Sequence, residues 1–306
     1  MTARDHVLST WLIALALGSN GCDDPLKSVS LLAETRVLGA RVEVDADPTR
    51  SSARPGEHAA LRFFVAAPDG EPRFSYALSV CAVPLTNSGL PSCAGAPFAS
   101  GLRAEAGRED ARLDFRVPED LDLAVTPHAF ATGLICANSG LDFDGQGAPI
   151  CTAGSGTEVA FEFELGSAEQ SNRSPTFGAG AFSLDGEPWP HNEQGSCDDG
   201  SLPSVTEKAR STLAVDLVGT DFEHLVPQTS LEPSRETLLL SPFASAGKLA
   251  HGFLSLSADS SREQRQVTWD APETEDGRPR MIHFYFVVRD ARGGEDFATR
   301  ALCVVP

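Results

Sequence analysis

Apolar and polar side chains alternate along short segments of this chain, and this alternation limits the fold more than any other feature of the sequence. Successive side chains of an extended strand point to opposite faces, so an alternating segment buries one face and exposes the other. Before residue 166, the segments with alternating or densely apolar side chains are 41–45, 61–65, 74–80, 112–117, 130–136 and 159–165. Pro, Gly and Asp lie between them, as is typical of turns. The sequence therefore predicts an all-β fold.

The length of 306 residues predicts two domains, because single domains usually hold roughly 100–150 residues. We expect a first domain at 34–165, a polar linker at 166–176 and a second domain at 177–306. About seven short strands between turns are the pattern of an immunoglobulin-like sandwich. The predicted fold is thus two immunoglobulin-like antiparallel β-sandwich domains, joined by a linker that limited proteolysis cuts first. In the second domain, a short helix over 207–217 is the alternative to a strand.

Residues 1–21 have the composition of a signal peptide, with an apolar run from Val7 to Leu17 that is too short to span a bilayer. Their end resembles a bacterial lipoprotein signal, because the small residue Gly21 precedes Cys22. Ser19 departs from that pattern, which usually has Leu there. The resemblance implies that Cys22 is lipidated, that residues 22–33 form a tether, and that the protein is exported to the bacterial cell envelope and anchored in a membrane. A secretory cleavage after Ala16 is the alternative.

The remaining cysteines are even in number, and in an exported chain this predicts disulfides. They are Cys81, Cys93, Cys136, Cys151, Cys197 and Cys303. No C-x-x-C pair occurs, and no His lies three to five residues from another, so the spacing argues against a zinc site.

Two short motifs recur in the same order in both halves of the chain. Asp-Gly-Glu-Pro at 69–72 recurs at 185–188, and the FATGLIC segment at 130–136 resembles FATRALC at 297–303. An internal duplication would explain both matches. It favours Cys81–Cys136 and Cys197–Cys303, with Cys93–Cys151 by elimination. The alternative keeps Cys197–Cys303 and adds two local bridges, Cys81–Cys93 and Cys136–Cys151.

The end of the chain resembles the last strands of bacterial PKD- and cadherin-like immunoglobulin sandwiches. The matching segments are VTWDAP at 267–272 and FYFVVRDARGGEDFATRALCV at 284–304. The resemblance implies the fold and an extracytoplasmic setting, and it brings no catalytic motif.

The formal net charge of −19 argues against a nucleic-acid partner, because phosphate backbones attract clustered Lys and Arg. The G-x-S-x-G motif of many hydrolases is absent and the His residues are scattered, so we expect no enzyme and no cofactor. Asp142 and Asp144 form a weak calcium pattern, for which a plain Asp-Gly turn is the favoured interpretation. Trp269 is expected in the core, and Trp189 is a candidate for an exposed, sugar-stacking side chain.

These observations predict a non-enzymatic, lipid-anchored envelope protein that acts as a binding or spacer module. Its partners would be the membrane, through the N-terminal lipid, and an envelope protein or glycan that the sequence does not identify. The alternatives are a carbohydrate- or calcium-dependent adhesion module and an accessory subunit of an envelope protein complex.

Lipidation of Cys22 is testable with labelled palmitate in the bacterial host. The wild-type protein should incorporate the label, and the Cys22→Ser variant should not, because the thiol is the acyl acceptor. Label that persists in the variant would argue against the anchor.

Overall fold

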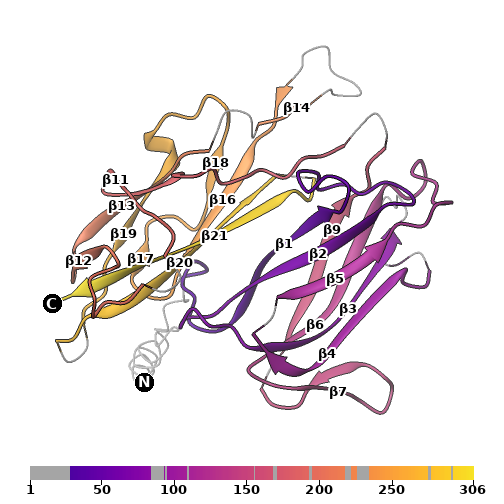
Figure 1. The fold of residues 1–306 in the computed structure, drawn as a ribbon, viewed down its shortest axis with the longest axis horizontal. Helices are drawn as coiled ribbons and strands as arrows, with labels where there is room; N and C mark the ends of the chain where they lie inside the picture. The colour runs from indigo at the N-terminus through magenta and orange to yellow at the C-terminus, as the bar shows by residue number, and fades with distance from the viewer. Residues whose placement is uncertain are drawn as a thin grey trace, which may run out of the picture.

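The computed structural model describes residues 28–83, 93, 95–108, 110–154, 156–167, 171–192, 195–217, 222–225, 234–274, 277–290 and 292–306. These residues form two β-sandwiches that lie side by side (Figure 1). Cys22 and the expected signal peptide lie outside the described residues. Where the chain is described, it contains no helix with the length and apolarity that crossing a membrane requires.

The first sandwich consists of a three-stranded and a four-stranded sheet, with strand orders β1-β2-β5 and β4-β3-β6-β9. The strands of the smaller sheet are β1 (Arg36–Val44), β2 (His58–Ala66) and β5 (Ala111–Arg116). Those of the larger sheet are β3 (Phe74–Val83), β4 (Ala99–Gly107), β6 (His128–Ala137) and β9 (Gly156–Glu164). A separate hairpin joins β7 (Leu141–Phe143) to β8 (Pro149–Cys151).

The alternation seen in the sequence builds the core of this sandwich. In β5 every second residue, Ala111, Leu113 and Phe115, is buried, while the residues between them are exposed. The buried side chains of both sheets meet in one apolar cluster that includes Val42, Leu61 and Phe163. The predicted all-β, immunoglobulin-like fold is confirmed.

The second sandwich has two five-stranded sheets, with orders β11-β10-β13-β19-β17 and β12-β21-β20-β16-β18. The first sheet contains β10 (Phe182–Leu184), β11 (Glu187–Pro188), β13 (Arg210–Val215), β17 (Lys248–Leu249) and β19 (Gln266–Asp270). The second contains β12 (Ser204–Thr206), β16 (Leu238–Ala244), β18 (Leu254–Leu256), β20 (Arg280–Arg289) and β21 (Glu295–Val305). A two-stranded pair, β14 (His224–Leu225) with β15 (Ser234–Arg235), and a 3-10 turn, η2 (Glu263–Arg265), complete it.

One alternative and one prediction for this sandwich are wrong. The segment 207–217 contains strand β13 in place of a helix, because Leu213 and Val215 pack in the core and the strand pairs with both β10 and β19. Trp189 is 2% exposed and therefore offers no stacking surface. Its ring packs edge-on against Phe284, and its indole N–H donates to the Ala301 carbonyl. Trp269 lies in the core as expected.

The disulfides follow the local alternative in the first sandwich. Cys81 is bonded to Cys93, Cys136 to Cys151 and Cys197 to Cys303. The favoured pair Cys81–Cys136 is wrong because both cysteines lie on the paired strands β3 and β6, where Cys81 faces Phe130 and Cys136 faces Ser75. They are thus at opposite ends of the ladder, roughly 20 Å apart, far beyond the reach of a disulfide. Cys93–Cys151 fails with it.

The duplication that suggested those pairs is not supported by the topology. The first Asp-Gly-Glu-Pro segment, 69–72, connects β2 of one sheet to β3 of the other. The second, 185–188, forms the tight hairpin between β10 and β11 within one sheet. The two segments share turn chemistry, in which Gly70 and Gly186 adopt positive φ, and not a position in the fold.

An apolar cluster joins the two sandwiches, so they share an interface. Leu38 and Ala66 of the first sandwich pack with Tyr285 and Val287 of β20, and Leu32 from the preceding segment completes the cluster. The ring of Phe64 stacks on that of Phe297 across the junction, with centroids 4.7 Å apart. The outer face of the β20–β21 hairpin is therefore covered by the first sandwich (Figure 1).

The segments expected to be tether and linker are also attached to the sandwiches where they are described. Leu32 is fully buried, and its N–H donates to the Ala244 carbonyl of β16. Asn172, in the expected linker, is 1% exposed and accepts a backbone hydrogen bond from Ser51. Because this backbone is hydrogen-bonded, these residues do not offer the free backbone that first cleavage by a protease requires.

The interface predicts a stability effect for Phe64→Ala. Loss of the ring removes its contacts with Phe297 and Tyr285, and we expect the free energy of unfolding in urea to fall by about 2 kcal/mol. The matched control is Phe143→Ala, whose side chain is 47% exposed on β7 and whose loss should change stability by less than about 0.5 kcal/mol. Equal effects of the two substitutions would contradict a stabilising interface.

Candidate functional site

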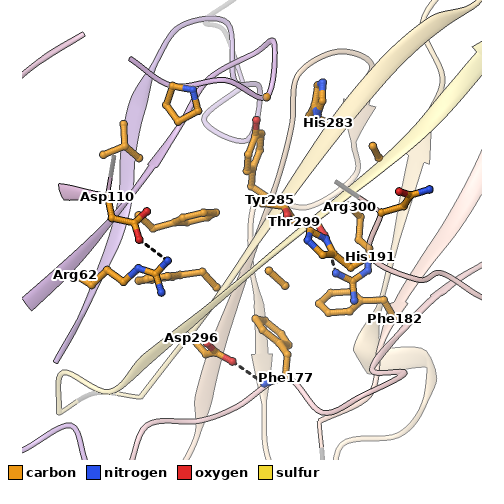
Figure 2. Close-up of a pocket in the computed structure, with 18 of the residues that line it drawn as sticks. Arg62, Asp110, Phe177, Phe182, His191, His283, Tyr285, Asp296, Thr299 and Arg300 are labelled. Atoms are coloured by element: carbon orange, nitrogen blue, oxygen red, sulfur yellow. Dashed lines mark hydrogen bonds and ion pairs between the residues drawn. The ribbon is translucent and has the colours of Figure 1, made fainter. Parts of the chain in front are cut away.

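A cleft of about 730 Å³ lies between the two sandwiches (Figure 2). One wall comes from β2 and the turn that follows it, and the other from β20 and β21. Clefts of a few hundred to about 1,000 Å³ at domain junctions are the usual place for small-molecule sites. Because the two walls belong to different sandwiches, the contacts between the sandwiches set the shape of the cleft.

Aromatic rings form the floor of the cleft. Phe64 and Phe297 stack there with nearly parallel rings, and Tyr285 packs against Phe64. The Tyr285 hydroxyl donates to the Ala67 carbonyl of the first sandwich, and burial raises the pKa of this phenol well above its usual range. Tyr285 is therefore a fixed hydrogen-bond donor between the sandwiches and does not titrate near neutral pH.

Ion pairs form much of the polar surface of the cleft. Arg62 and Asp110 are 2.6 Å apart on the first sandwich, and Arg41 and Asp296 are 2.7 Å apart across the junction. The other oxygen of Asp296 accepts the backbone N–H of Phe177 at 2.8 Å, as Figure 2 shows. Asp296 thus holds one rim of the cleft together by joining Arg41 and Phe177 to β21.

Arg300, on β21, is surrounded by backbone carbonyls and an aromatic ring. Its Nε donates to the Trp189 carbonyl at 2.8 Å and its Nη1 to the Thr299 carbonyl at 2.6 Å. The guanidinium lies over the Phe182 ring, 4.0 Å from the centroid. His191 lies beside it, with Nδ1 3.0 Å from the Thr299 carbonyl oxygen. Burial lowers the pKa of Arg300 to about 10, so the side chain remains charged at neutral pH.

His283 closes the end of the cleft nearest the β2–β3 turn. Its ring packs so tightly on Gly70 that a Cβ at this glycine would lie 2.5 Å from the ring carbon Cε1. Gly70 also has a φ of +80°, so two separate constraints require glycine there. Burial lowers the pKa of His283, which favours its neutral form, although the nearby Asp69 carboxylate acts in the opposite direction.

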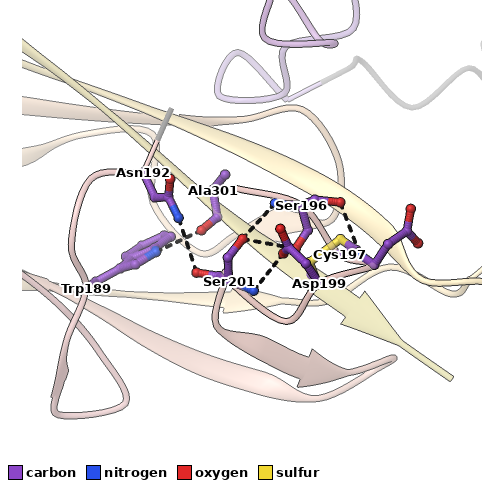
Figure 3. Close-up of a disulfide and its surroundings, with 9 residues drawn as sticks. Trp189, Asn192, Ser196, Cys197, Asp199, Ser201 and Ala301 are labelled. Atoms are coloured by element: carbon purple, nitrogen blue, oxygen red, sulfur yellow. Dashed lines mark hydrogen bonds between the residues drawn. A yellow bond between two sulfur atoms is a disulfide. The ribbon is translucent and has the colours of Figure 1, made fainter. Parts of the chain in front are cut away.

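His191 lies on the rim of the cleft. The disulfide Cys197–Cys303 attaches the loop that follows His191 to β21 (Figure 3). Within this loop Ser201 donates its N–H to Asp199, and its hydroxyl oxygen accepts the N–H of Ser196. The Asn192 side chain donates to the Ser201 carbonyl, which connects the braced loop to the cleft. The bridge therefore fixes the position of the rim relative to β21.

A second polar cluster lies at the junction, around the tip of the β20–β21 hairpin. Arg292 contacts Glu223, lies 3.5 Å from Glu236 and 3.9 Å from Glu164 of the first sandwich. Asp290 accepts a hydrogen bond from the Asn172 amide at 2.7 Å. The acids thus outnumber the single arginine. Burial and the neighbouring Asp290 raise the pKa of Glu236 to about 7, and one of its oxygens has no hydrogen-bond partner among the described residues.

The predicted calcium residues form a turn. One oxygen of Asp144 accepts the N–H groups of Gln146 and Ala148, both at 2.8 Å, and these bonds lower its pKa. Asp142 accepts the N–H of Phe143 on β7. Across the described part of the chain, no three His, Cys, Asp or Glu side chains lie in an arrangement that would hold a metal ion. The geometry is that of an Asp-Gly turn.

Sequence reasoning missed the cleft residues, although one signal was present. Along β21 the residues that alternate toward the core are Ala298, Arg300, Leu302 and Val304. A charged residue at an inward-facing position of an apolar strand needs a specific environment, so Arg300 was identifiable as an exception to the pattern. The pairing of Arg62 with Asp110 and the approach of β21 to β2 depend on tertiary contacts that no local pattern encodes.

No protein-family model and no curated protein matches the chain. Among solved structures, the D00-D0 domain of intimin aligns at 10% identity and a TM-score of 0.24, covering 87% of this chain and 100% of that one. The Enterococcus faecalis MSCRAMM ACE aligns at 10% identity and a TM-score of 0.22, covering 90% and 97%. The protocadherin GammaB4 extracellular domain aligns at 12% identity and a TM-score of 0.19, covering 87% and 33%. Similarities this low assign no family, and the fold assignment rests on the strand order described above.

The raised pKa of Glu236 predicts that stability depends on pH. A carboxyl whose folded-state pKa lies above its unfolded value contributes stability at low pH, and that contribution is lost as pH rises toward 7. We expect the midpoint of thermal unfolding to fall between pH 5 and pH 8, and Glu236→Gln to reduce this fall by raising the midpoint mainly at pH 8.

The control is Glu223→Gln, which removes the closest carboxylate of Arg292 and should destabilise the protein at both pH values. Differential scanning calorimetry of the three proteins checks the expectation. An unchanged pH dependence in Glu236→Gln would show that this carboxyl titrates in its ordinary range.

Proposed function

We propose that this chain is a non-enzymatic, exported protein of the bacterial cell envelope, anchored by lipid at Cys22, which binds a ligand in the cleft between its two sandwiches. The cleft is the observation that supports binding over a spacer role. A spacer needs only rigid packing, whereas here the junction leaves a polar recess of about 730 Å³. The three disulfides agree with export, because they form and persist in oxidising compartments.

The same bridges support a non-enzymatic role. All six cysteines of the mature chain beyond Cys22 are in disulfides, so none of them offers a thiolate nucleophile. The cleft histidines are held by backbone and packing contacts, His191 at the Thr299 carbonyl and His283 against Gly70. These contacts suit positioning and binding.

The attachment of the tether supports an anchor close to the sandwich junction. Leu31 and Leu32 contact Ala244 of β16, so the chain is fixed to the second sandwich from there onward. The residues between Cys22 and this point span at most about 35 Å when extended. A lipid at Cys22 would therefore hold the junction, and with it the cleft, near the membrane surface.

A second candidate function is an accessory subunit that docks to another envelope protein. Leu102 on β4 and Phe143 on β7 are large apolar side chains, 56% and 47% exposed, on two strands that contact each other. We call these two side chains the β4–β7 patch. Exposed apolar side chains on neighbouring strands favour a protein partner.

Capture from detergent-solubilised envelopes distinguishes the two candidates. Met281→Trp places a large ring in the cleft, whereas Leu102→Trp changes only the β4–β7 patch. If the cleft is the binding site, material retained by the wild-type protein should be lost with Met281→Trp and kept with Leu102→Trp. The reverse pattern would favour the accessory subunit, and unchanged retention by both would overturn the cleft as the binding site. Unfolding midpoints near the wild-type value establish that both variants are folded.

A further inference from the structure

We propose that the cleft recognises the carboxylate of a small acidic molecule, and that Arg300 is the residue that binds it. This inference rests on the proposed function, because it names the chemical class of ligand for the same cleft. Three features of Arg300 support it: its contacts, the charges around it and the planar arrangement of the N–H groups that have no acceptor.

The guanidinium of Arg300 is held in place before any ligand arrives. Two backbone carbonyls, those of Trp189 and Thr299, accept its N–H groups, and its plane is supported by the Phe182 ring. Trp189 is itself fixed by the hydrogen bond that its indole N–H donates to the carbonyl of Ala301, which lies on β21 next to Arg300. An arginine held in this way loses little side-chain entropy on binding, which favours its use in recognition.

The other arginines of the cleft already have carboxylate partners. Arg41 pairs with Asp296, Arg62 with Asp110 and Arg108 with Glu71, which lies 2.5 Å away. Arg300 has no carboxylate within ion-pair distance in the described part of the chain, and its known acceptors are neutral carbonyls. A half-buried cation without a counter-charge is unfavourable, and an anionic ligand in the cleft would supply that charge.

The cleft holds one cation without a counter-charge in an acidic protein. Its described lining contains four arginines, at 41, 62, 108 and 300, against two aspartates, at 110 and 296, and Glu71 pairs with Arg108 beside it, so Arg300 is the arginine left without an acidic partner. The chain as a whole has a formal net charge of −19. A cation of this kind in an acidic surface attracts an anion at one place, while the surface repels anions elsewhere. This contrast favours a small anion over a large acidic polymer, which the surrounding surface would repel.

The free donors of Arg300 match a carboxylate. A guanidinium has five N–H donors in one plane. Two of those on Arg300 have acceptors, so three remain on the two terminal nitrogens. Two coplanar N–H groups bind the two oxygens of a carboxylate in a bidentate pair. The volume of the cleft, about 730 Å³, suits an acid of small-molecule size.

The experiment uses the full-length protein in detergent, with sodium D-glucuronate as the probe, D-glucose as its neutral counterpart and sodium acetate as the bare carboxylate. Ionic strength is held constant with sodium chloride. Isothermal titration calorimetry should give saturable binding of glucuronate by the wild-type protein and no binding of glucose. Arg300→Gln should weaken glucuronate binding by roughly tenfold to a hundredfold, because a bidentate charged pair is lost.

Two further variants separate charge from geometry. Arg300→Lys keeps the charge without the planar fork and should bind with intermediate affinity. Arg210→Gln removes an exposed arginine of β13 that pairs with Asp270 of β19, outside the cleft, and should bind like the wild type. Acetate that binds the wild type and not Arg300→Gln would support recognition of the carboxylate alone.

Three results would overturn the proposal: equal binding of glucose and glucuronate, unchanged glucuronate binding by Arg300→Gln, or no binding of either carboxylate by the wild type. These outcomes are distinct from failure of the proposed function. If Met281→Trp abolishes capture from envelopes while neither carboxylate binds, the cleft stands as a binding site and only the ligand class is wrong.

Discussion

The buried carboxylate of Glu295 joins the two sandwiches, and the rest of the arrangement depends on it. One of its oxygens accepts the Ala40 N–H on the free edge of β1 at 2.8 Å, and the other lies 2.6 Å from Arg289, which in turn donates to the Leu38 carbonyl. Leu38 lies at the irregularity in the β1–β2 register, between Val37 and Gly39, and Ala40 follows just after it. A Cβ at Gly39 would lie 2.1 Å from the Glu295 oxygen, so the contact requires glycine. The side chains of one sandwich thus complete the hydrogen bonding of an edge strand in the other, which also protects that edge from pairing with other chains.

This contact has an electrostatic consequence. Burial raises the pKa of Glu295 to about 7, although Arg289 acts against the shift. Glu236 has a similarly raised pKa at the hairpin tip, so the junction holds two carboxyls that gain protons more readily than ordinary ones. Both lie in or beside the β20–β21 hairpin, on the side of the junction away from Arg300. The hairpin thus holds carboxyls with a pKa of about 7, and the cleft holds Arg300 with a pKa of about 10. A change of pH near neutrality therefore alters the charge of the hairpin and leaves Arg300 charged.

Alternation in the sequence was sufficient to predict the fold class, because residues such as Leu113 and Phe115 face the core at every second position. It failed where a tertiary contact overrides the local pattern. Trp189 lies between two prolines and looked exposed, yet its indole N–H finds a carbonyl on β21 and the ring is buried. The pairing of Cys81 was misassigned because strand order, and not motif similarity, sets the distance between cysteines. The cleft combines residues more than 200 positions apart, such as Phe64 and Phe297, and no local signal encodes their approach. Of the cleft residues, only Arg300 could have been singled out from the sequence, because it is a charged residue at an inward-facing position of an apolar strand.

The rigidity of the junction bears on how a ligand would bind. The stacked rings of Phe64 and Phe297 fix the floor, the Cys197–Cys303 bridge fixes the rim, and backbone carbonyls fix the guanidinium of Arg300. A site built in this way pays little ordering entropy on binding, so even a few polar contacts give useful affinity. The same rigidity argues against a hinge that closes over the ligand, because opening the sandwiches would expose the apolar cluster of Leu32, Leu38 and Val287 to water. Selectivity would then depend on the charge and shape already present in the cleft, and the three arginines with carboxylate partners leave Arg300 as the residue best placed to provide it.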